Sequence, residues 1–262
     1  MMPLKDRYEK ILIEQDDIDF DDMIGKALEY VLNGSFKPQW KYIMVDEFQD
    51  ISDPRARLVK ALKDKAVDCS LFCVGDDWQA IYRFAGSDIS FTTGFTNYFG
   101  VTQFTKLKKT FRFNSSIADI SSEFVLKNPF QTKKTITTLE KVKAPSVSLL
   151  RQTNKVIPGN NEKFNKVISK LSKNPDSSDS AYTLGRYLQV DKVLKAIIKL
   201  NNKASVLIQG RYNFTLPSPS EMELHREKFP TLDLIKNTVH SSKGKEADFV
   251  IILGLQSGKN GF

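Results

Sequence analysis

The chain has 262 residues, which is enough for one large domain or two domains of ordinary size, each with its own hydrophobic core. Its composition, 40% hydrophobic and 27% charged, is typical of a soluble globular protein. The uninterrupted apolar runs are too short to cross a bilayer, and residues 1–10 do not resemble a signal peptide, so we expect no membrane association. Thirty-nine basic against 31 acidic residues give a formal net charge of +8, which mildly favours a polyanionic partner.

The chain contains two cysteines, Cys69 and Cys73, beside and within an apolar run. A disulfide framework would need more cysteines, and a metal site would need more ligands. We therefore expect buried, reduced thiols in a cytoplasmic protein.

The first third of the chain predicts a strand–helix–strand unit. Residues 19–34 have helical periodicity, with acidic residues in the first turn and Gly34 at the end. A buried strand at 42–45 precedes a helix opened by Pro54, and a second buried strand follows at 70–74. This spacing predicts a right-handed crossover within a parallel sheet.

Two adjacent carboxylates, Asp46 and Glu47, directly follow the first of these strands. Open α/β folds bind their ligands at the carboxyl ends of parallel strands. Asp46 is suited to hold a hydrated Mg²⁺ ion, and Glu47 is suited to polarise a water molecule against a phosphoryl group. Acidic pairs are also common on ordinary surfaces, so the pair alone leaves a purely structural interpretation open.

The rest of the chain predicts a second α/β layer, joined to the first near residues 105–115. A short strand precedes a helix at 116–126, capped by Asn114 or Ser115, and residues 127–144 form a connection. The later expected elements are a strand at 146–150, a helix at 162–171, a loop at 172–180, a helix near 191–200, a strand at 205–209, an irregular segment at 215–230, a strand ending before Thr238, a polar loop at 241–247 and a strand at 249–253.

Five blocks, in order, resemble superfamily 1 DNA helicases of the UvrD/Rep type. They are residues 45–50 (Val-Asp-Glu-Phe-Gln-Asp), 74–86, 110–114 (Thr-Phe-Arg-Phe-Asn), 210–212 (Gly-Arg-Tyr) and 238–248, and the acidic stretch 18–22 also fits the family. The resemblance implies an α/β fold of parallel-sheet, RecA-like layers, as in P-loop NTPases. It divides the chain into two incomplete motor domains, 1–108 and 109–262, and implies ATP-driven 3′–5′ translocation on single-stranded DNA.

The resemblance assigns nucleotide chemistry to seven residues. Asp46 becomes the Mg²⁺ ligand, Glu47 the general base, Gln79 the γ-phosphate sensor, and Arg112 the cation that stabilises the transferring phosphoryl group. The remaining three are a ring that stacks on adenine (Phe111), a residue of the nucleotide site or of the interdomain cleft (Arg211) and a ribose contact (Glu246). Gln79 has an alternative role as a loop-capping amide, and Phe111 has one as a core residue.

On the DNA side, the resemblance places Phe84 as a base-stacking platform. Tyr82, like Trp78, is a weaker stacking candidate, because aromatic residues at such spacing often fill a core. Thr238 and His240 resemble residues that bond the backbone of single-stranded DNA, and Lys243 adds positive charge. His240 has an alternative role as a structural hydrogen-bonding residue. No motif includes the other histidine, His225, which we expect on the surface.

The sequence departs from the family in several places. It contains no glycine-rich loop that ends in Gly-Lys-Thr or Gly-Lys-Ser, the loop that cradles phosphates, because Gly244-Lys245 is followed by Glu246. Ala85 replaces an arginine that many relatives have, and the chain stops at Phe262, before the arginine-bearing helix of the second motor domain. Only 26 residues (212 to 237) separate Arg211 from Thr238, which leaves no room for a large inserted domain and favours the helicase IV branch.

Two hypotheses follow from these observations. In the first, the chain is part of a helicase whose N-terminal portion of the motor is missing, and alone it binds ATP weakly and does not unwind DNA. In the second, it is a non-catalytic module that keeps the helicase fold in order to bind nucleic acid or a protein such as RNA polymerase. The presence of Asp46, Glu47, Gln79 and Arg112 together favours the first hypothesis.

Overall fold

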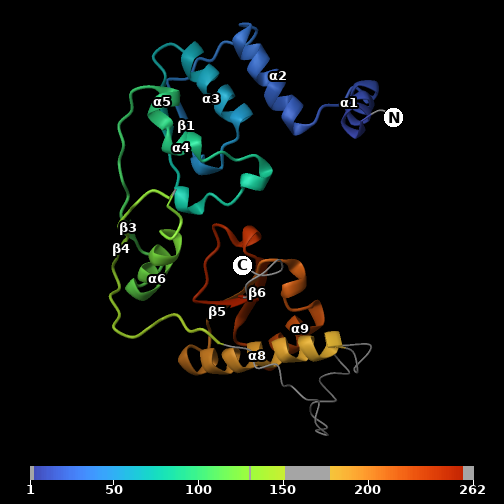
Figure 1. The fold of residues 1–262 in the computed structure, drawn as a ribbon, viewed down its shortest axis with the longest axis vertical. Helices are drawn as coiled ribbons and strands as arrows, with labels where there is room; N and C mark the ends of the chain where they lie inside the picture. Colours follow the sequence, from blue (N-terminus) through green and yellow to red (C-terminus); the bar gives the residue numbers. More distant parts are fainter. Residues whose placement is uncertain (1–2, 130, 151–177, 256–262) are drawn as a thin grey trace. The chain divides into compact units, whose positions relative to one another are not determined.

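The structure is a computed structural model that describes residues 3–129, 131–150 and 178–255 (Figure 1). The chain divides into two compact units, residues 1–146 and 147–262. Both contain parallel strands together with helices, so the expected mixed α/β class with parallel sheets is confirmed. The expected boundary between motor domains, at residue 108, stays a prediction. Among the described residues, no helix is long and apolar enough to span a membrane.

The first unit contains the β1–β2 sheet, the helices around it and three short elements that follow. In chain order they are α1 (Leu4–Gln15), α2 (Phe20–Leu32), β1 (Tyr42–Val45), α3 (Asp53–Lys65), β2 (Ser70–Cys73), α4 (Ser90–Thr93), α5 (Phe95–Phe99), β3 (Lys109–Thr110), α6 (Ser115–Val125) and β4 (Thr137–Thr138). Helix α1 was not predicted, and none of its residues is buried. The expected helices at 19–34 and 116–126 are confirmed, with Asp19 and Asn114 as their caps.

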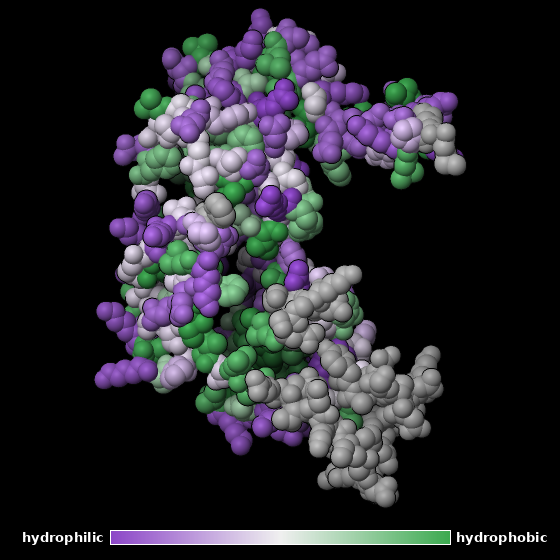
Figure 2. Space-filling view, viewed as in Figure 1, coloured by the Kyte–Doolittle hydropathy of each residue, from purple (hydrophilic) through white to green (hydrophobic). Residues whose placement is uncertain are grey.

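Strands β1 and β2 pair in parallel, with Tyr42 opposite Ser70 and Val45 opposite Cys73, as predicted. One face of this sheet packs on the 3₁₀ turn after β1 and on helices α3, α4 and α5, around Phe48, Phe91 and Phe95. The other face is bare in the described structure, and its Tyr42, Met44 and Phe72 side chains are exposed. Figure 2 shows hydrophobic residues (green) at the surface between hydrophilic ones (purple).

The two cysteines are free, but each is only partly buried, so the prediction of buried thiols is correct only in part. Burial is still sufficient to raise the pKa of the Cys73 thiol to about 12. At neutral pH Cys73 is therefore a neutral thiol that packs against the core of the first unit.

The connection predicted at 127–144 is more structured than expected. Its residues Thr137 and Thr138 form β4, which pairs in parallel with β3. Upstream of β4, the Thr132 amide donates to the Asp77 carboxylate (3.0 Å), and the Thr132 carbonyl accepts a hydrogen bond from the Trp78 indole (2.9 Å). This segment is thereby attached to the turn that follows β2.

In the second unit, one helix precedes the sheet in the chain, and another connects two of its strands. Its elements are α8 (Ser178–Leu200), β5 (Ser205–Gly210), α9 (Pro219–Lys228), β6 (Asp233–Thr238) and β7 (Phe249–Leu253). The sheet has the order β6-β5-β7 and is parallel throughout, and the three strands expected here are confirmed. Helices α8 and α9 pack on one face of the sheet, where Leu194 and Met222 meet Ile208 (Figure 1).

Four expectations for this part of the chain either differ from the structure or lie outside the described residues. Residues 146–150 do not form the expected strand, because they have no strand to pair with in the described structure. Helix α8 begins at Ser178, inside the predicted loop 172–180, and α9 occupies the segment 215–230 that was expected to be irregular. Pro219 stands at the start of α9, where a proline is favourable, and Ser218 and Glu221 form a capping box. The expected helix at 162–171 lies outside the described residues.

The expectation that His225 lies on the surface is wrong. It is fully buried on α9, and its ring stacks on Tyr187 of α8, with centroids 4.4 Å apart. The reason is the amphipathic packing of α9 on α8, which turns this position inward. Burial lowers the pKa of His225 to about 4, despite the opposing carboxylates of Asp191 and Glu221.

Candidate nucleotide and nucleic-acid sites

The carboxyl ends of β1 and β2 carry a group of polar residues that we call the acidic edge: Asp46, Glu47, Asp76, Asp77 and Gln79. The Asp46 carboxylate accepts a hydrogen bond from the Glu47 amide (2.8 Å). Glu47 has a left-handed backbone conformation, with φ of 49°. Because β1 and β2 are adjacent, the structure brings Asp46, Glu47 and Gln79 to one edge of the sheet, as expected.

Gln49 joins the two halves of this edge. It is fully buried; its amide nitrogen donates to the Glu47 carboxylate (2.5 Å), and its amide oxygen accepts from the Asp76 backbone (2.8 Å). A Cβ atom on Gly75 would lie 2.8 Å from that amide oxygen, so only glycine fits there without displacement. Gln49 belongs to the first of the five motif blocks, but no role was predicted for it. Its position directly after the acid pair was the available signal.

Gln79 and Lys134 both contact the Asp76 carboxylate. The Gln79 amide donates to it (2.8 Å), and the Lys134 ammonium pairs with both Asp76 and Asp77. Partial burial alone would raise the pKa of Asp76, but the Lys134 and Gln79 hydrogen bonds hold it below its usual value. Lys134 lies in the segment predicted as a simple connection, and no local pattern indicates that its side chain would reach this edge.

The acidic edge suits a Mg²⁺ ion that arrives with a nucleotide. Asp46 is exposed at the end of β1, and one of its oxygens is already oriented by the Glu47 amide. Within the described residues there is no group of three or more histidine, cysteine or carboxylate side chains that could enclose a metal. One carboxylate with water and phosphate oxygens is the usual way in which proteins bind Mg²⁺.

The aromatic candidates of the first unit are at the surface. Phe111 and Arg112 follow β3 and are exposed, so the alternative of Phe111 as a core residue does not hold. Phe84 is also exposed, and its ring meets the half-buried Tyr82 edge to face, with centroids 6.1 Å apart. Exposed rings of this kind are available for stacking, although their assigned partners stay predictions.

In the second unit, three candidates lie at the carboxyl edge of the sheet. Thr238 ends β6, and its hydroxyl lies 2.9 Å from that of Ser241. Arg211 follows β5, and the half-buried His240 begins the turn after β6. Gly210 and Thr238 are opposite each other in the register, so the structure brings Arg211 and Thr238 to neighbouring strand ends.

The other two candidates, Lys243 and Glu246, lie further along the loop to β7. Lys243 is half-buried, whereas Glu246 is exposed. The roles of all the residues from Arg211 to Glu246 stay predictions.

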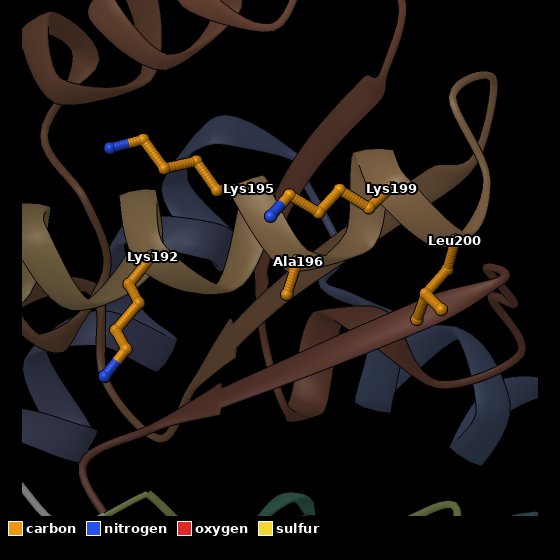
Figure 3. A pocket seen from close by; sticks show the side chains of 5 residues that line it. All are labelled: Lys192, Lys195, Ala196, Lys199 and Leu200. Carbon is orange, nitrogen blue, oxygen red and sulfur yellow. The ribbon is translucent and has the colours of Figure 1, made fainter.

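A shallow hollow of about 420 Å³ runs along helix α8 and is lined by Lys192, Lys195, Ala196, Lys199 and Leu200 (Figure 3). The three lysines extend outward from the helix, and Lys192 points to a different side from Lys195. Lys195 already pairs with Asp191 (2.7 Å). The hollow contains none of the predicted site residues and is a surface feature of one helix.

Comparisons with known proteins agree with the motif order. Residues 2–100 match the UvrD/REP helicase N-terminal domain family. Over its whole length the chain is 35% identical to DNA helicase IV of Escherichia coli (strain K12), of which it covers 33%. Over about half of its length it is similar to the putative ATP-dependent DNA helicase YjcD and to the ATP-dependent DNA helicase PcrA, both of Bacillus subtilis (strain 168), at 30% and 29% identity, and it covers 20% and 18% of these relatives.

The chain is therefore similar to DNA helicases of the UvrD/Rep type, and the expected resemblance is confirmed. The similarity to DNA helicase IV extends from end to end of this sequence, which agrees with the expected branch. The chain spans about a third of the length of that relative and about a fifth of the other two.

Proposed function

We propose that this chain is the nucleotide- and DNA-contacting part of an ATP-dependent helicase that moves 3′ to 5′ along single-stranded DNA. The observation that carries the proposal is the acidic edge, where Asp46 and Glu47 end one parallel strand and Gln79 follows the next. A strand tip with adjacent acids and a neighbouring amide suits hydrolysis of a phosphoanhydride. The two RecA-like layers would be residues 1–108 and 109–262.

At the acidic edge, each residue has a distinct task. Asp46 would hold Mg²⁺, which neutralises charge on the phosphates. Glu47, oriented by Gln49, would accept the proton of the attacking water, and Gln79 would contact the terminal phosphate. Arg112 would stabilise charge on the transferred group.

The remaining candidates divide between nucleotide and DNA. Phe111 would stack on adenine and Glu246 would contact the ribose, whereas Arg211 would bind the nucleotide or support the interdomain cleft. The DNA strand would be contacted by Phe84, Tyr82, Thr238, His240 and Lys243, through stacking and through phosphate contacts.

The bare face of the β1–β2 sheet supports the view that the motor includes further polypeptide. Parallel sheets are normally covered on both faces, yet Tyr42, Met44 and Phe72 are exposed here. This sequence also contains no phosphate-cradling loop, and it covers a third of its helicase IV relative. We infer that a segment outside this sequence covers this face and supplies that loop. The isolated chain would then bind ATP weakly and would not unwind DNA.

The first experiment measures ATP hydrolysis by the isolated chain, with and without single-stranded DNA. We expect turnover well below about 1 s⁻¹, the low end for typical enzymes. DNA-stimulated turnover above that rate would contradict the proposed inactivity of this part alone.

The second experiment tests the acidic edge in a longer polypeptide that includes a phosphate loop upstream. Replacing a general base typically costs about 10²–10⁴-fold in rate, so Glu47→Gln should lower kcat by that factor while ATP binding persists. Glu29→Gln, an exposed change on α2, is the matched control and should leave kcat unchanged. A Glu47→Gln enzyme with wild-type kcat would exclude this assignment.

The absence of a phosphate loop from this sequence also supports a second candidate function, a non-catalytic module that binds nucleic acid or RNA polymerase. Such a module would bind single-stranded DNA with strong salt dependence but without any response to ATP or ADP. A change in DNA affinity on adding nucleotide to the longer polypeptide would favour the helicase instead.

A further inference from the structure

Two aromatic side chains after β5 form a stacked pair that no assigned role uses. The rings of Tyr212 and Phe214 lie nearly parallel, with an interplanar angle of 12° and centroids 5.1 Å apart. Tyr212 is half-buried, whereas Phe214 is 63% exposed. We call this pair the aromatic ledge. A large apolar ring held in solvent beside a second ring offers its surface to another planar group.

The backbone beneath the ledge is fixed by hydrogen bonds and close packing. The Thr215 hydroxyl donates to the Tyr212 carbonyl (2.7 Å), and Arg186 of α8 donates to the Phe214 carbonyl (3.2 Å). Arg186 is itself held by two hydrogen bonds to the buried Glu221 carboxylate. A Cβ atom on Gly210 would lie 2.2 Å from the Thr215 hydroxyl, so the turn packs directly on the end of β5. The exposure of Phe214 therefore belongs to a well-anchored turn.

The charge around the ledge favours a polyanion. The Arg211 guanidinium lies 5.3 Å from the centroid of the Tyr212 ring. Gly210, the last residue of β5, is opposite Thr238 in the register, so the ledge follows the strand next to the one that ends at Thr238. The loop after Thr238 adds Lys243 and Lys245. Aromatic rings beside positive charge are the usual components of a surface that binds single-stranded nucleic acid.

We propose that the aromatic ledge is a stacking platform for a base of single-stranded DNA, with Phe214 as the ring that contacts the base. The inference rests on the proposed function for the presence of a strand at this edge, and it adds a contact that the predicted Thr238, His240 and Lys243 do not supply. Those three would hold the phosphate backbone, whereas the ledge would hold a base. The contact would tolerate any sequence, because every base has a π-face.

The test compares two strands with equal phosphate counts, a thymidine 20-mer and an abasic 20-mer, in binding to the full 262-residue chain. Phe214→Leu keeps an apolar side chain but removes the ring. We expect it to weaken thymidine binding at least about 5-fold, while abasic binding stays unchanged. Phe214→Tyr should retain wild-type affinity. Phe124→Leu, an exposed change on α6, is the matched control and should alter neither affinity.

Four results would overturn the proposal that Phe214 stacks on a base. If Phe214→Leu changes neither strand's affinity, or weakens both equally, Phe214 does not stack on a base. If Phe214→Leu weakens binding of a fluorescent ATP analogue but not of the thymidine strand, the Phe214 ring binds a free nucleotide instead of DNA. These results leave the DNA-binding proposal intact, because wild-type affinity would still be measured. If the wild-type chain binds neither strand, the DNA-binding proposal fails, and the ledge fails with it.

Discussion

The β1–β2 sheet and the β6-β5-β7 sheet show how differently parallel strands can be supported. In both units, helices pack on one face of the sheet. In the second unit, β5 lies between β6 and β7, and its Val206 and Leu207 are buried on opposite faces. In the first unit, β1 and β2 have only each other as neighbours in the described sheet, and alternate residues such as Met44 are exposed. Val250 and Ile252 on the outer strand β7 are exposed as well, so the difference lies in the central strand that the second sheet has and the first does not.

The comparison also shows how the acidic edge is held in place. With few neighbours around the sheet, its polar groups depend on specific contacts, which are the Gln49 amide between Glu47 and Asp76 and the Lys134 pair with Asp76 and Asp77. In the second unit, by contrast, the edge residues follow a strand with a closely packed core beneath it. We therefore expect changes of buried side chains to act strongly in the second unit, and polar or steric changes at the acidic edge to dominate in the first.

The largest effect is expected from Arg186→Met in the second unit. It would leave the fully buried Glu221 carboxylate without its guanidinium partner, which should cost about 3–5 kcal/mol of unfolding free energy. Hydrogen exchange of the β5 amides measures this unit specifically. Arg186→Met with Glu221→Gln should recover at least about 1 kcal/mol, because the glutamine carries no charge and retains the cap. A cost below about 1 kcal/mol for the single variant would mean that the pair does not hold this unit together.

Two methionine truncations compare the sheets directly. Met222 is 1% exposed on α9, and Met222→Ala should cost about 2–5 kcal/mol. Met44 is 77% exposed on β1, and Met44→Ala should change the unfolding free energy by less than about 0.5 kcal/mol. Both tryptophans, Trp40 and Trp78, belong to the first unit. Tryptophan fluorescence therefore measures the effect of Met44→Ala, and hydrogen exchange of the β5 amides measures the effect of Met222→Ala. If both truncations lowered the unfolding free energy equally, Met44 would be buried in solution, and the bare face of the β1–β2 sheet would be covered.

The buried His225 predicts an acid-dependent loss of stability in the second unit. Its folded pKa is about 4, against an ordinary value of 6.5, so the unfolded chain binds a proton first. Stability should therefore fall as the pH drops from about 6.5 towards 4, by up to about 3 kcal/mol. His225→Phe keeps a ring on Tyr187 and should flatten this part of the profile. The nearby Asp191 does not titrate in this window, because Lys195 and Lys228 hold its pKa below the usual value against the effect of burial. An unchanged profile in the variant would show that other groups cause the loss.

A smaller effect than the loss of the Arg186 partner is expected from Gly75→Ala in the first unit. The new methyl group would lie 2.8 Å from the Gln49 amide oxygen and 3.1 Å from the Gln49 backbone nitrogen, which should cost about 1–3 kcal/mol and separate Gln49 from Asp76. Gly25→Ala, on α2 with no atom within 4 Å, is the matched control and should stabilise the helix by about 0.5–1 kcal/mol. Tryptophan fluorescence during denaturation compares the two. If both variants gain stability, the contact with Gln49 is not a constraint.

Strands and caps were predictable because their signals are local. The runs at 42–45, 205–209 and 249–253 are short, apolar and followed by polar residues, and the structure has strands there. Asn114 was expected to cap a helix, and its side chain accepts a hydrogen bond from the Ile117 amide (3.2 Å). The placement of Asp46 and Gln79 at one edge followed from the same strand pattern.

Other features depended on parts of the chain far away in sequence. β4 has two residues and exists only through its pairing with β3, and Lys134 reaches Asp76 across 58 positions. His225 looked like a surface residue because its partner Tyr187 lies on another helix. Helix α9 is different, since its signal is local: Ser218 and Glu221 form a capping box that can be read from the sequence.

The two-stranded arrangement of β1 and β2 has a practical consequence for work with the isolated polypeptide. Each of the two strands has one side without a neighbour in the described sheet, and its backbone donors and acceptors there can recruit a strand from another molecule. Self-association should therefore increase with protein concentration. Dilute samples are the ones in which the single chain can be observed.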